Sequence, residues 1–218
     1  AYAEPMLYRR VLAAYGLDKP IWIGEANVVP YDDPAGKLER NNQRASLQEQ
    51  AAWVIQATAL ARAAGVERFE VYKMRDEGSD NGVHWGLVRD DGSVRPAYLA
   101  YQTAAQQFGG ATNATLFWGG STFPPSNAQT QAVLSSANDR WQFIWPSRLV
   151  GVRMQRGDSL VTVVWNTSPQ PLSVFIPTDK PVSAVDKLGK PVPLGQAAGG
   201  YKLDLAPATH NTDSRDPT

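Results

Sequence analysis

The sequence predicts a mixed fold in which an α/β segment is followed by an all-β segment. Residues 1–110 alternate between helical and strand patterns, as expected of a parallel α/β unit. After residues 109–110, a Gly-Gly pair, short β-branched runs are interrupted by Pro, Gly, Asn and Asp, which is typical of antiparallel strands. This change predicts two units, residues 1–110 and 111–209, followed by a polar tail at 210–218.

Capping signals mark three helices in the first unit. Ser46 with Glu49 three residues later is a capping box, in which each residue satisfies a backbone N–H that the helix start leaves free. Gly16 and Gly65 supply left-handed caps, and Pro96 suits a first helical turn. The expected helices span residues 4–15, 46–65 and 96–108.

Two apolar runs predict parallel strands in the same unit. Residues 21–25 are apolar without alternation, as expected of a strand buried on both faces, and residues 68–74 follow the long helix. A polar loop at 31–44 separates the first strand from that helix. Two parallel strands alone would leave open edges, and an eight-stranded barrel needs about 250 residues. The first unit therefore looks incomplete.

The second unit predicts antiparallel strands. Residues 149–155 and 159–165 are β-rich arms around an Arg-Gly-Asp turn, which predicts a hairpin. Further strands are expected at residues 172–176, 182–185 and 201–205.

Composition excludes several classes of protein. Lys and Arg total 21 and Asp and Glu total 21, and this zero net charge argues against nucleic-acid or anionic-membrane partners. There are no cysteines, and the two histidines, His84 and His210, cannot form a three-histidine zinc site, so we expect no metal and no cofactor. The first residues lack the apolar core of a signal peptide. We expect a secreted or extracellular parent protein whose signal lies outside this chain.

Glu25 is the strongest catalytic candidate. It ends the first apolar run, where a buried carboxylate must be paired or hydrogen-bonded because burying an isolated charge is costly. At the carboxyl end of a barrel strand it would face an active site. The alternative is a structural ion pair with Arg or Lys on a neighbouring strand, and the residues alone leave the two interpretations equal.

The sequence around Glu25 resembles the retaining (β/α)8 glycoside hydrolase superfamily. Residues 20–27, Pro-Ile-Trp-Ile-Gly-Glu-Ala-Asn, are similar to its seventh strand, which ends in the nucleophilic Glu. Residues 71–76 and 85–98, with Gly-Leu, Asp-Gly-Ser and Arg-Pro-Ala-Tyr in order, resemble its eighth strand and last helix. Residues 149–208 look like the β-domain often appended to these barrels. The likeness covers most of the chain and is closest to β-xylosidase-like and exopolysaccharide-degrading members.

This resemblance implies a fold and an activity. The fold would be the carboxyl-terminal part of a (β/α)8 TIM barrel followed by an antiparallel β-sandwich domain. The activity would be retaining hydrolysis of β-linked glycans, with oligo- or polysaccharide as substrate and a covalent intermediate on Glu25. The superfamily's acid/base follows an Asn on the fourth strand. This chain has no Asn-Glu pair, so we expect that residue upstream of Ala1 and no turnover by this chain alone. The rival hypothesis is a non-catalytic carbohydrate-binding or scaffolding module.

Five further residues are candidates for substrate binding. Family members often place an aromatic ring beneath the reacting sugar, and Tyr72 or Trp85 could serve here. Tyr31 could line the same cleft or merely pack its loop, with equal weight. Asp76 could contact substrate, although anchoring of the loop by a salt bridge or turn hydrogen bonds is favoured. His84 could contact a substrate hydroxyl, but a solvated loop histidine is the simpler interpretation.

Overall fold

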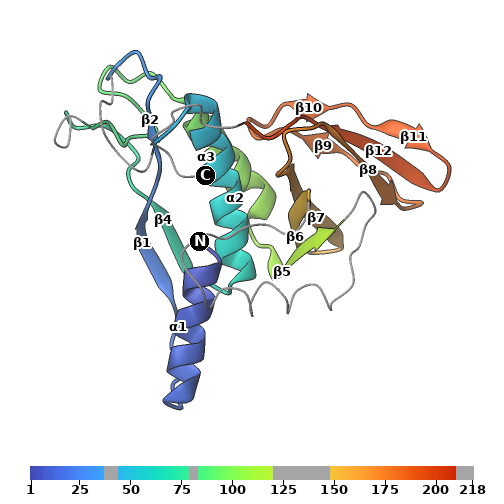
Figure 1. The fold of residues 1–218 in the computed structure, drawn as a ribbon, viewed down its shortest axis with the longest axis horizontal. Helices are drawn as coiled ribbons and strands as arrows, with labels where there is room; N and C mark the ends of the chain where they lie inside the picture. The colour runs from blue at the N-terminus through green and yellow to red at the C-terminus, as the bar shows by residue number, and fades with distance from the viewer. Residues whose placement is uncertain (37–43, 79–82, 120–147, 210–218) are drawn as a thin grey trace.

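The computed structural model describes residues 1–36, 44–78, 83–119 and 148–209 (Figure 1). The predicted tail at 210–218 lies outside these residues. The helices are α1 Ala3–Ala14, α2 Leu47–Ala63 and α3 Pro96–Phe108. The strands are β1 Trp22–Ala26, β2 Val29–Pro30, β3 Arg44–Ala45, β4 Arg68–Val71, β5 Thr112–Gly119, β6 Leu149–Arg156, β7 Ser159–Asn166, β8 Leu172–Pro177, β9 Ala184–Val185, β10 Pro191–Val192, β11 Gly195–Ala197 and β12 Gly200–Leu205.

A parallel strand pair and two central helices form the first part of the molecule. Strands β1 and β4 are parallel, and Trp22 pairs with Arg68 and Ile23 with Phe69. Helix α2 connects the pair and packs beside α3, so that the two helices separate the β1–β4 pair from the antiparallel sheets (Figure 1). Short strands β2 and β3 add a second parallel pairing that the sequence did not predict. The mixed α/β architecture confirms the predicted fold class at this level, whereas the barrel remains a prediction.

The helix boundaries follow the predicted signals. Ser46 and Glu49 form the reciprocal capping box of α2, with hydrogen bonds of 3.1 Å from the Glu49 N–H to Ser46 Oγ and 2.6 Å from the Ser46 N–H to Glu49 Oε2. Gly16 and Gly65 follow α1 and α2 with φ of +67° and +68°, the left-handed conformation that favours glycine. None of the helices in the described ranges is long and apolar enough to cross a membrane.

The prediction that strand 21–25 is buried on both faces is wrong. Trp22 is 57% exposed and Glu25 is also exposed, whereas Ile21 just before the strand is buried. One face of the β1–β4 pair packs on α2, where the Phe69 and Trp53 rings lie 6.2 Å apart. The other face has no covering layer among the described residues. Strand β4 is also shorter than predicted, because it ends at Val71 instead of residue 74.

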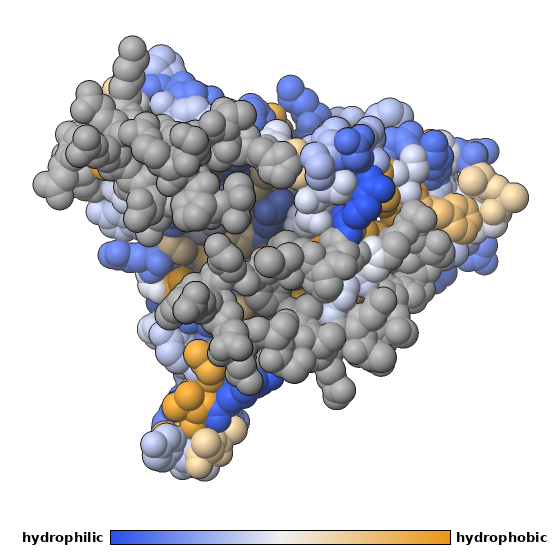
Figure 2. All heavy atoms as spheres, viewed as in Figure 1, coloured by the Kyte–Doolittle hydropathy of each residue, from blue (hydrophilic) through white to orange (hydrophobic). Residues whose placement is uncertain are grey.

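Helix α1 carries an apolar face that solvent reaches. Leu7, Val11 and Tyr15, spaced four residues apart on the helix, are 53%, 48% and 79% exposed. Figure 2 shows hydrophobic surface on the part of α1 that projects from the body. Tyr2, Met6 and Leu12 join the opposite side of the helix to the main core, and Arg9 donates to the backbone oxygens of Ala64 and Gly65.

Two three-stranded antiparallel sheets make up most of the second part. Strands β6 and β7 form the predicted hairpin around residues 157–158, and β5, which was not predicted individually, adds a third strand in the order β5-β6-β7. Strands β8, β11 and β12 form the second sheet in the order β11-β12-β8. The strand predicted at 182–185 is reduced to Ala184–Val185, which pairs with Pro191–Val192.

The main core joins the helices to the first antiparallel sheet. It includes Ala61 of α2, Phe108 of α3 and three fully buried side chains of β6, Val150, Val152 and Met154. A smaller cluster contains Phe117 and Leu149 from the first sheet and Leu172 and Val174 from the second. The two antiparallel sheets therefore share apolar contacts, while a sandwich domain remains a prediction.

Candidate functional site

Asn27 joins two strand ends at the carboxyl end of β1. Its side chain is buried, and Nδ2 donates to the backbone oxygens of Tyr72 (2.7 Å) and Trp85 (2.8 Å). Gln50 of α2 reaches the same place, where Nε2 donates to Val28 O at 2.9 Å and to Asn27 Oδ1 at 3.4 Å. These bonds satisfy backbone carbonyls that would cost free energy if they were buried without a hydrogen bond. They also fix Tyr72 and Trp85 relative to the end of β1.

Glu25 lies two residues before Asn27. The pairing register between β1 and β4 shifts between Ile23 and Ala26, so Glu25 sits in a bulged part of the strand. Bulges re-aim side chains and are frequent beside active sites. Among the described residues, the Glu25 carboxylate has no ion-pair or hydrogen-bond partner. The expected pairing is therefore not observed, and because Glu25 is exposed, its charge carries no large desolvation cost.

Two aromatic rings meet beside this strand end. The rings of Tyr72 and Trp85 are 6.3 Å apart at an interplanar angle of 65°, an edge-to-face arrangement. Both residues are half-buried, and the Tyr72 N–H donates to Ala26 O at 3.1 Å. Lys73 Nζ lies 5.5 Å from the centre of the Tyr72 ring. An accessible carboxylate and two partly exposed rings thus share one end of the β1–β4 pair.

A buried ionic network connects the loops that follow β2 and β4. The Arg95 side chain is fully buried; it donates to Asp33 and to the Gly86 carbonyl, and its Nη1 lies 2.8 Å from Asp76 Oδ2. Arg89 Nε binds the other side of Asp33, 3.0 Å from Oδ1. The Gly86 N–H donates to Asp76 Oδ1 at 2.6 Å. The network pins the segment that contains Trp85 against the loop after β2.

The charge on Asp33 is stabilised by its partners. Burial alone would raise the pKa of this carboxyl group. The Ala35 N–H and the Arg95 and Arg89 side chains outweigh burial, so the pKa of Asp33 is below its ordinary value. Asp33 is therefore an ionised anchor of the loop.

Of the remaining predicted residues, Asp76 and His84 are neighbours, and Tyr31 belongs to the loop after β2. Tyr31 is half-buried, and its backbone N–H donates to Ala45 O at 2.8 Å, which ties its loop to β3. Asp76 has a side-chain exposure of 1% and lies in the ionic network, as the loop-anchoring interpretation requires. His84 is half-buried close to Asp76, with 3.5 Å between Nδ1 and Oδ2.

Sequence reasoning missed the residues that organise this region. Asn27 and Arg95 were noticed only as parts of motifs, and Asp33 and Gln50 were not singled out. Asp33 and Arg95 are 62 positions apart, and no spacing rule connects them. Asn27 could have been found from its chemistry, because a polar residue directly after an apolar strand has to satisfy its hydrogen bonds locally.

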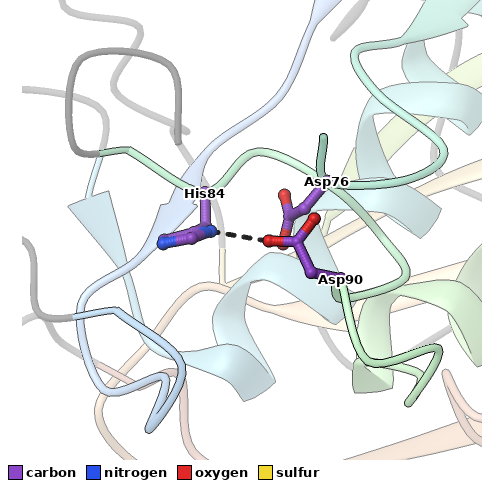
Figure 3. Close-up of side chains that lie close together, drawn as sticks. All are labelled: Asp76, His84 and Asp90. Carbon is purple, nitrogen blue, oxygen red and sulfur yellow. Dashed lines mark ion pairs between the residues drawn. The ribbon is translucent and has the colours of Figure 1, made fainter. Parts of the chain in front are cut away.

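Among the residues that the structure describes, one group of side chains could hold a metal ion. Asp76, His84 and Asp90 each direct one ligand atom toward the others, and these atoms all lie within 4.8 Å of one another (Figure 3).

Comparison with known proteins shows similarity to glycoside hydrolases. A solved family 39 glycoside hydrolase from Bacteroides cellulosilyticus WH2 matches 93% of this chain with a TM-score of 0.60 and 16% identity. The family 30 subfamily 8 xylanase Xyn30A from Clostridium acetobutylicum matches 91% with a TM-score of 0.48 and 10% identity. The chain spans only 36% and 42% of those two proteins. No family model and no curated protein matches the sequence. The chain therefore shares its fold with part of a family 39 glycoside hydrolase.

Proposed function

We propose that this chain is the carboxyl-terminal part of a retaining glycoside hydrolase that cleaves β-linked glycans, with Glu25 as the nucleophile. The observation that carries the proposal is the position of Glu25 at the carboxyl end of β1, where it is exposed and has no partner among the described residues. It lies two residues before Asn27, which binds the backbone oxygens of Tyr72 and Trp85. The fold shared with a family 39 glycoside hydrolase supports the same reaction class.

The proposed chemistry needs an accessible, ionised carboxylate. One Glu25 oxygen attacks the anomeric carbon, the bond to the leaving oxygen breaks, and an acid donates a proton to that oxygen. Water then attacks the glycosyl ester while the same acid/base residue removes its proton, which releases Glu25. The Tyr72 and Trp85 rings provide apolar surface for the face of a sugar bound beside Glu25.

The acid/base residue is proposed to lie in a segment that precedes Ala1. In retaining enzymes the two carboxyl groups are about 5–5.5 Å apart. Asp76 is a poor candidate for this second role, because it is held by Arg95 and by the Gly86 N–H. The chain also spans about a third of the family 39 structure. We therefore expect turnover only when the amino-terminal part of the barrel is present, in the same protein or on another chain.

The test is to trap the glycosyl–Glu25 intermediate. The complete protein in which the proposal places this chain is incubated with 2-fluoro glycosyl fluorides of the xylo and gluco series. The activated leaving group reduces the need for acid assistance, and the 2-fluoro group slows hydrolysis of the ester. Intact-mass spectrometry should show one glycosyl adduct, and peptide mapping should place it on Glu25.

Two variants make the test specific. Glu25→Gln should abolish the adduct and lower the hydrolysis rate by several orders of magnitude, because an amide is a poor nucleophile. Glu70→Gln, at an exposed Glu on the paired strand, should still be labelled. An adduct on a different carboxylate, or full activity in Glu25→Gln, would refute the assignment. Glycan binding by the complete protein without any adduct would instead support the non-catalytic hypothesis.

A further inference from the structure

Asp76, His84 and Asp90 converge from different turns of the segment between β4 and α3. Figure 3 shows the imidazole and the two carboxylates facing one another. Asp76 is buried, His84 is half-buried and Asp90 is exposed, so the group extends from the interior to the surface. None of these three residues is the nucleophile proposed above, Glu25.

Two buried atoms of this group make no hydrogen bond within the described part of the chain. They are Oδ2 of Asp76 and Nδ1 of His84, which lie 3.5 Å apart. Arg95 Nη1, which also donates to the Gly86 carbonyl, approaches Oδ2 to 2.8 Å as an ion pair. Buried polar atoms without a hydrogen bond are uncommon and often mark an unseen ion or water.

The separation of these atoms fits a shared metal ion better than a shared proton. An N–H···O hydrogen bond spans about 2.7–3.2 Å, which is shorter than the distance observed. Zinc holds nitrogen and oxygen ligands at about 2.0–2.2 Å, so two ligands at the tetrahedral angle are about 3.4 Å apart. The observed 3.5 Å agrees with that value.

We propose that Asp76, His84 and Asp90 bind a divalent transition-metal ion of the Zn²⁺ class. One imidazole and two carboxylates suit such an ion, and water would complete its coordination. The three ligand atoms lie within 4.8 Å of one another. Two ligands on opposite sides of one ion are at most about 4.2 Å apart with these bond lengths, so the upper limit of 4.8 Å is slightly too wide. Asp90, the exposed ligand, would have to move by this small difference while its Oδ1 keeps the hydrogen bond from the Gly78 N–H.

Neighbouring groups hold the ligands in place. The Gly86 N–H fixes Asp76 through Oδ1, which leaves Oδ2 for the ion. The His84 ring lies so close to Gly36 that no Cβ fits there, and the Gly78 N–H donates to Asp90 Oδ1 at 3.0 Å. Because the positive charge of Arg95 opposes a dication at the same oxygen, we expect micromolar rather than nanomolar affinity.

A metal was not expected from the sequence, since two histidines cannot form a three-histidine site. The structure suggests a different ligand set, in which one histidine is joined by carboxylates 8 positions before it and 6 after it. The ion would bridge the segment after β4 to the segment before α3 and so stabilise the position of Trp85.

Zinc titration tests the site directly. The tag-free chain is treated with EDTA, dialysed, and titrated with Zn²⁺ by calorimetry and by competition with a chromophoric chelator. We expect one Zn²⁺ per chain and a rise in melting temperature with zinc. His84→Ala should weaken binding at least tenfold and abolish the thermal shift, and Asp90→Asn should weaken binding by about tenfold.

Matched controls separate this site from adventitious zinc. His210→Ala removes the other histidine, and Asp91→Asn removes the neighbouring exposed carboxylate; both should bind as the wild type does. Circular dichroism without metal should confirm that every variant is folded. Absence of saturable binding in the wild type would overturn the proposal. Equal affinity in the wild type and His84→Ala would overturn it too.

Discussion

Replacing Arg95 with Met tests how strongly the buried ionic network stabilises the fold. Arg95 is fully buried and contacts three groups, the Asp33 and Asp76 carboxylates and the Gly86 carbonyl. Methionine fills part of the same volume but carries no charge. The variant therefore leaves Asp76 buried without its guanidinium and Asp33 with Arg89 as its remaining cation.

The expected loss of stability is about 3–5 kcal/mol, since removing one member of a buried pair leaves an uncompensated charge. By comparison, Lys202→Met breaks an ion pair with Asp204 whose side chains are 53% and 70% exposed, so water screens the pair and the loss of stability should be far smaller. At about 1.4 kcal/mol per tenfold, the buried change alters the folding equilibrium by at least a hundredfold.

Urea unfolding, followed by tryptophan fluorescence and circular dichroism in EDTA, measures both effects. The two variants should keep the wild-type dependence on urea, which shows that the same surface is exposed on unfolding. A second variant, Asp76→Asn in the Arg95→Met background, should recover part of the loss because it removes the stranded charge. If Arg95→Met costs no more than Lys202→Met, the buried network does not stabilise the fold.

Three other variants test separate features. The pKa of Asp33 in the folded protein is below its ordinary value of 3.8, so the stabilisation that its charge provides is complete above that pH and is lost as pH falls through the folded pKa. In Asp33→Asn, the free energy of unfolding should therefore fall less between about pH 5 and pH 2 than it does in the wild type. Urea titrations at each pH measure this difference. Ser46→Ala removes the cap that accepts from the Glu49 N–H and should lower the free energy of unfolding by about 1 kcal/mol; no measurable change would contradict the capping argument. Gly151→Ala places a Cβ against the Val163 carbonyl oxygen and should cost about 1–3 kcal/mol, visible as a lower melting temperature.

Local signals in the sequence were sufficient for several elements. The capping box at Ser46, the Pro96 start of α3 and the hairpin of β6 and β7 were all located within two residues. Each depends on neighbours within a few positions, so the residues themselves carry the information. Strand β5 was not recognised individually, because its polar start at Thr112 and Asn113 resembles a loop and its strand pairing comes from β6.

Long-range contacts account for what could not be predicted. Burial of residues 21–25 was inferred from their apolar character, but burial depends on which elements cover a strand, and Trp22 instead lies beneath the Arg68 guanidinium at 4.4 Å. The Asp33–Arg95 pair joins loops that only the completed fold brings together. The end of an apolar run identifies Glu25 in the sequence, but only the structure shows that it has no partner among the described residues.

The open β1–β4 pair affects how the chain behaves at high concentration. Each of the two strands has one neighbour among the described residues, so the outer N–H and C=O groups are available to a strand of another molecule. The exposed side chains of Leu7, Val11 and Trp22 add apolar surface to the same region. Self-association by strand addition is therefore expected to rise with concentration, and sedimentation velocity over a dilution series would measure it. The zinc and unfolding measurements should therefore use dilute protein, so that self-association does not contribute.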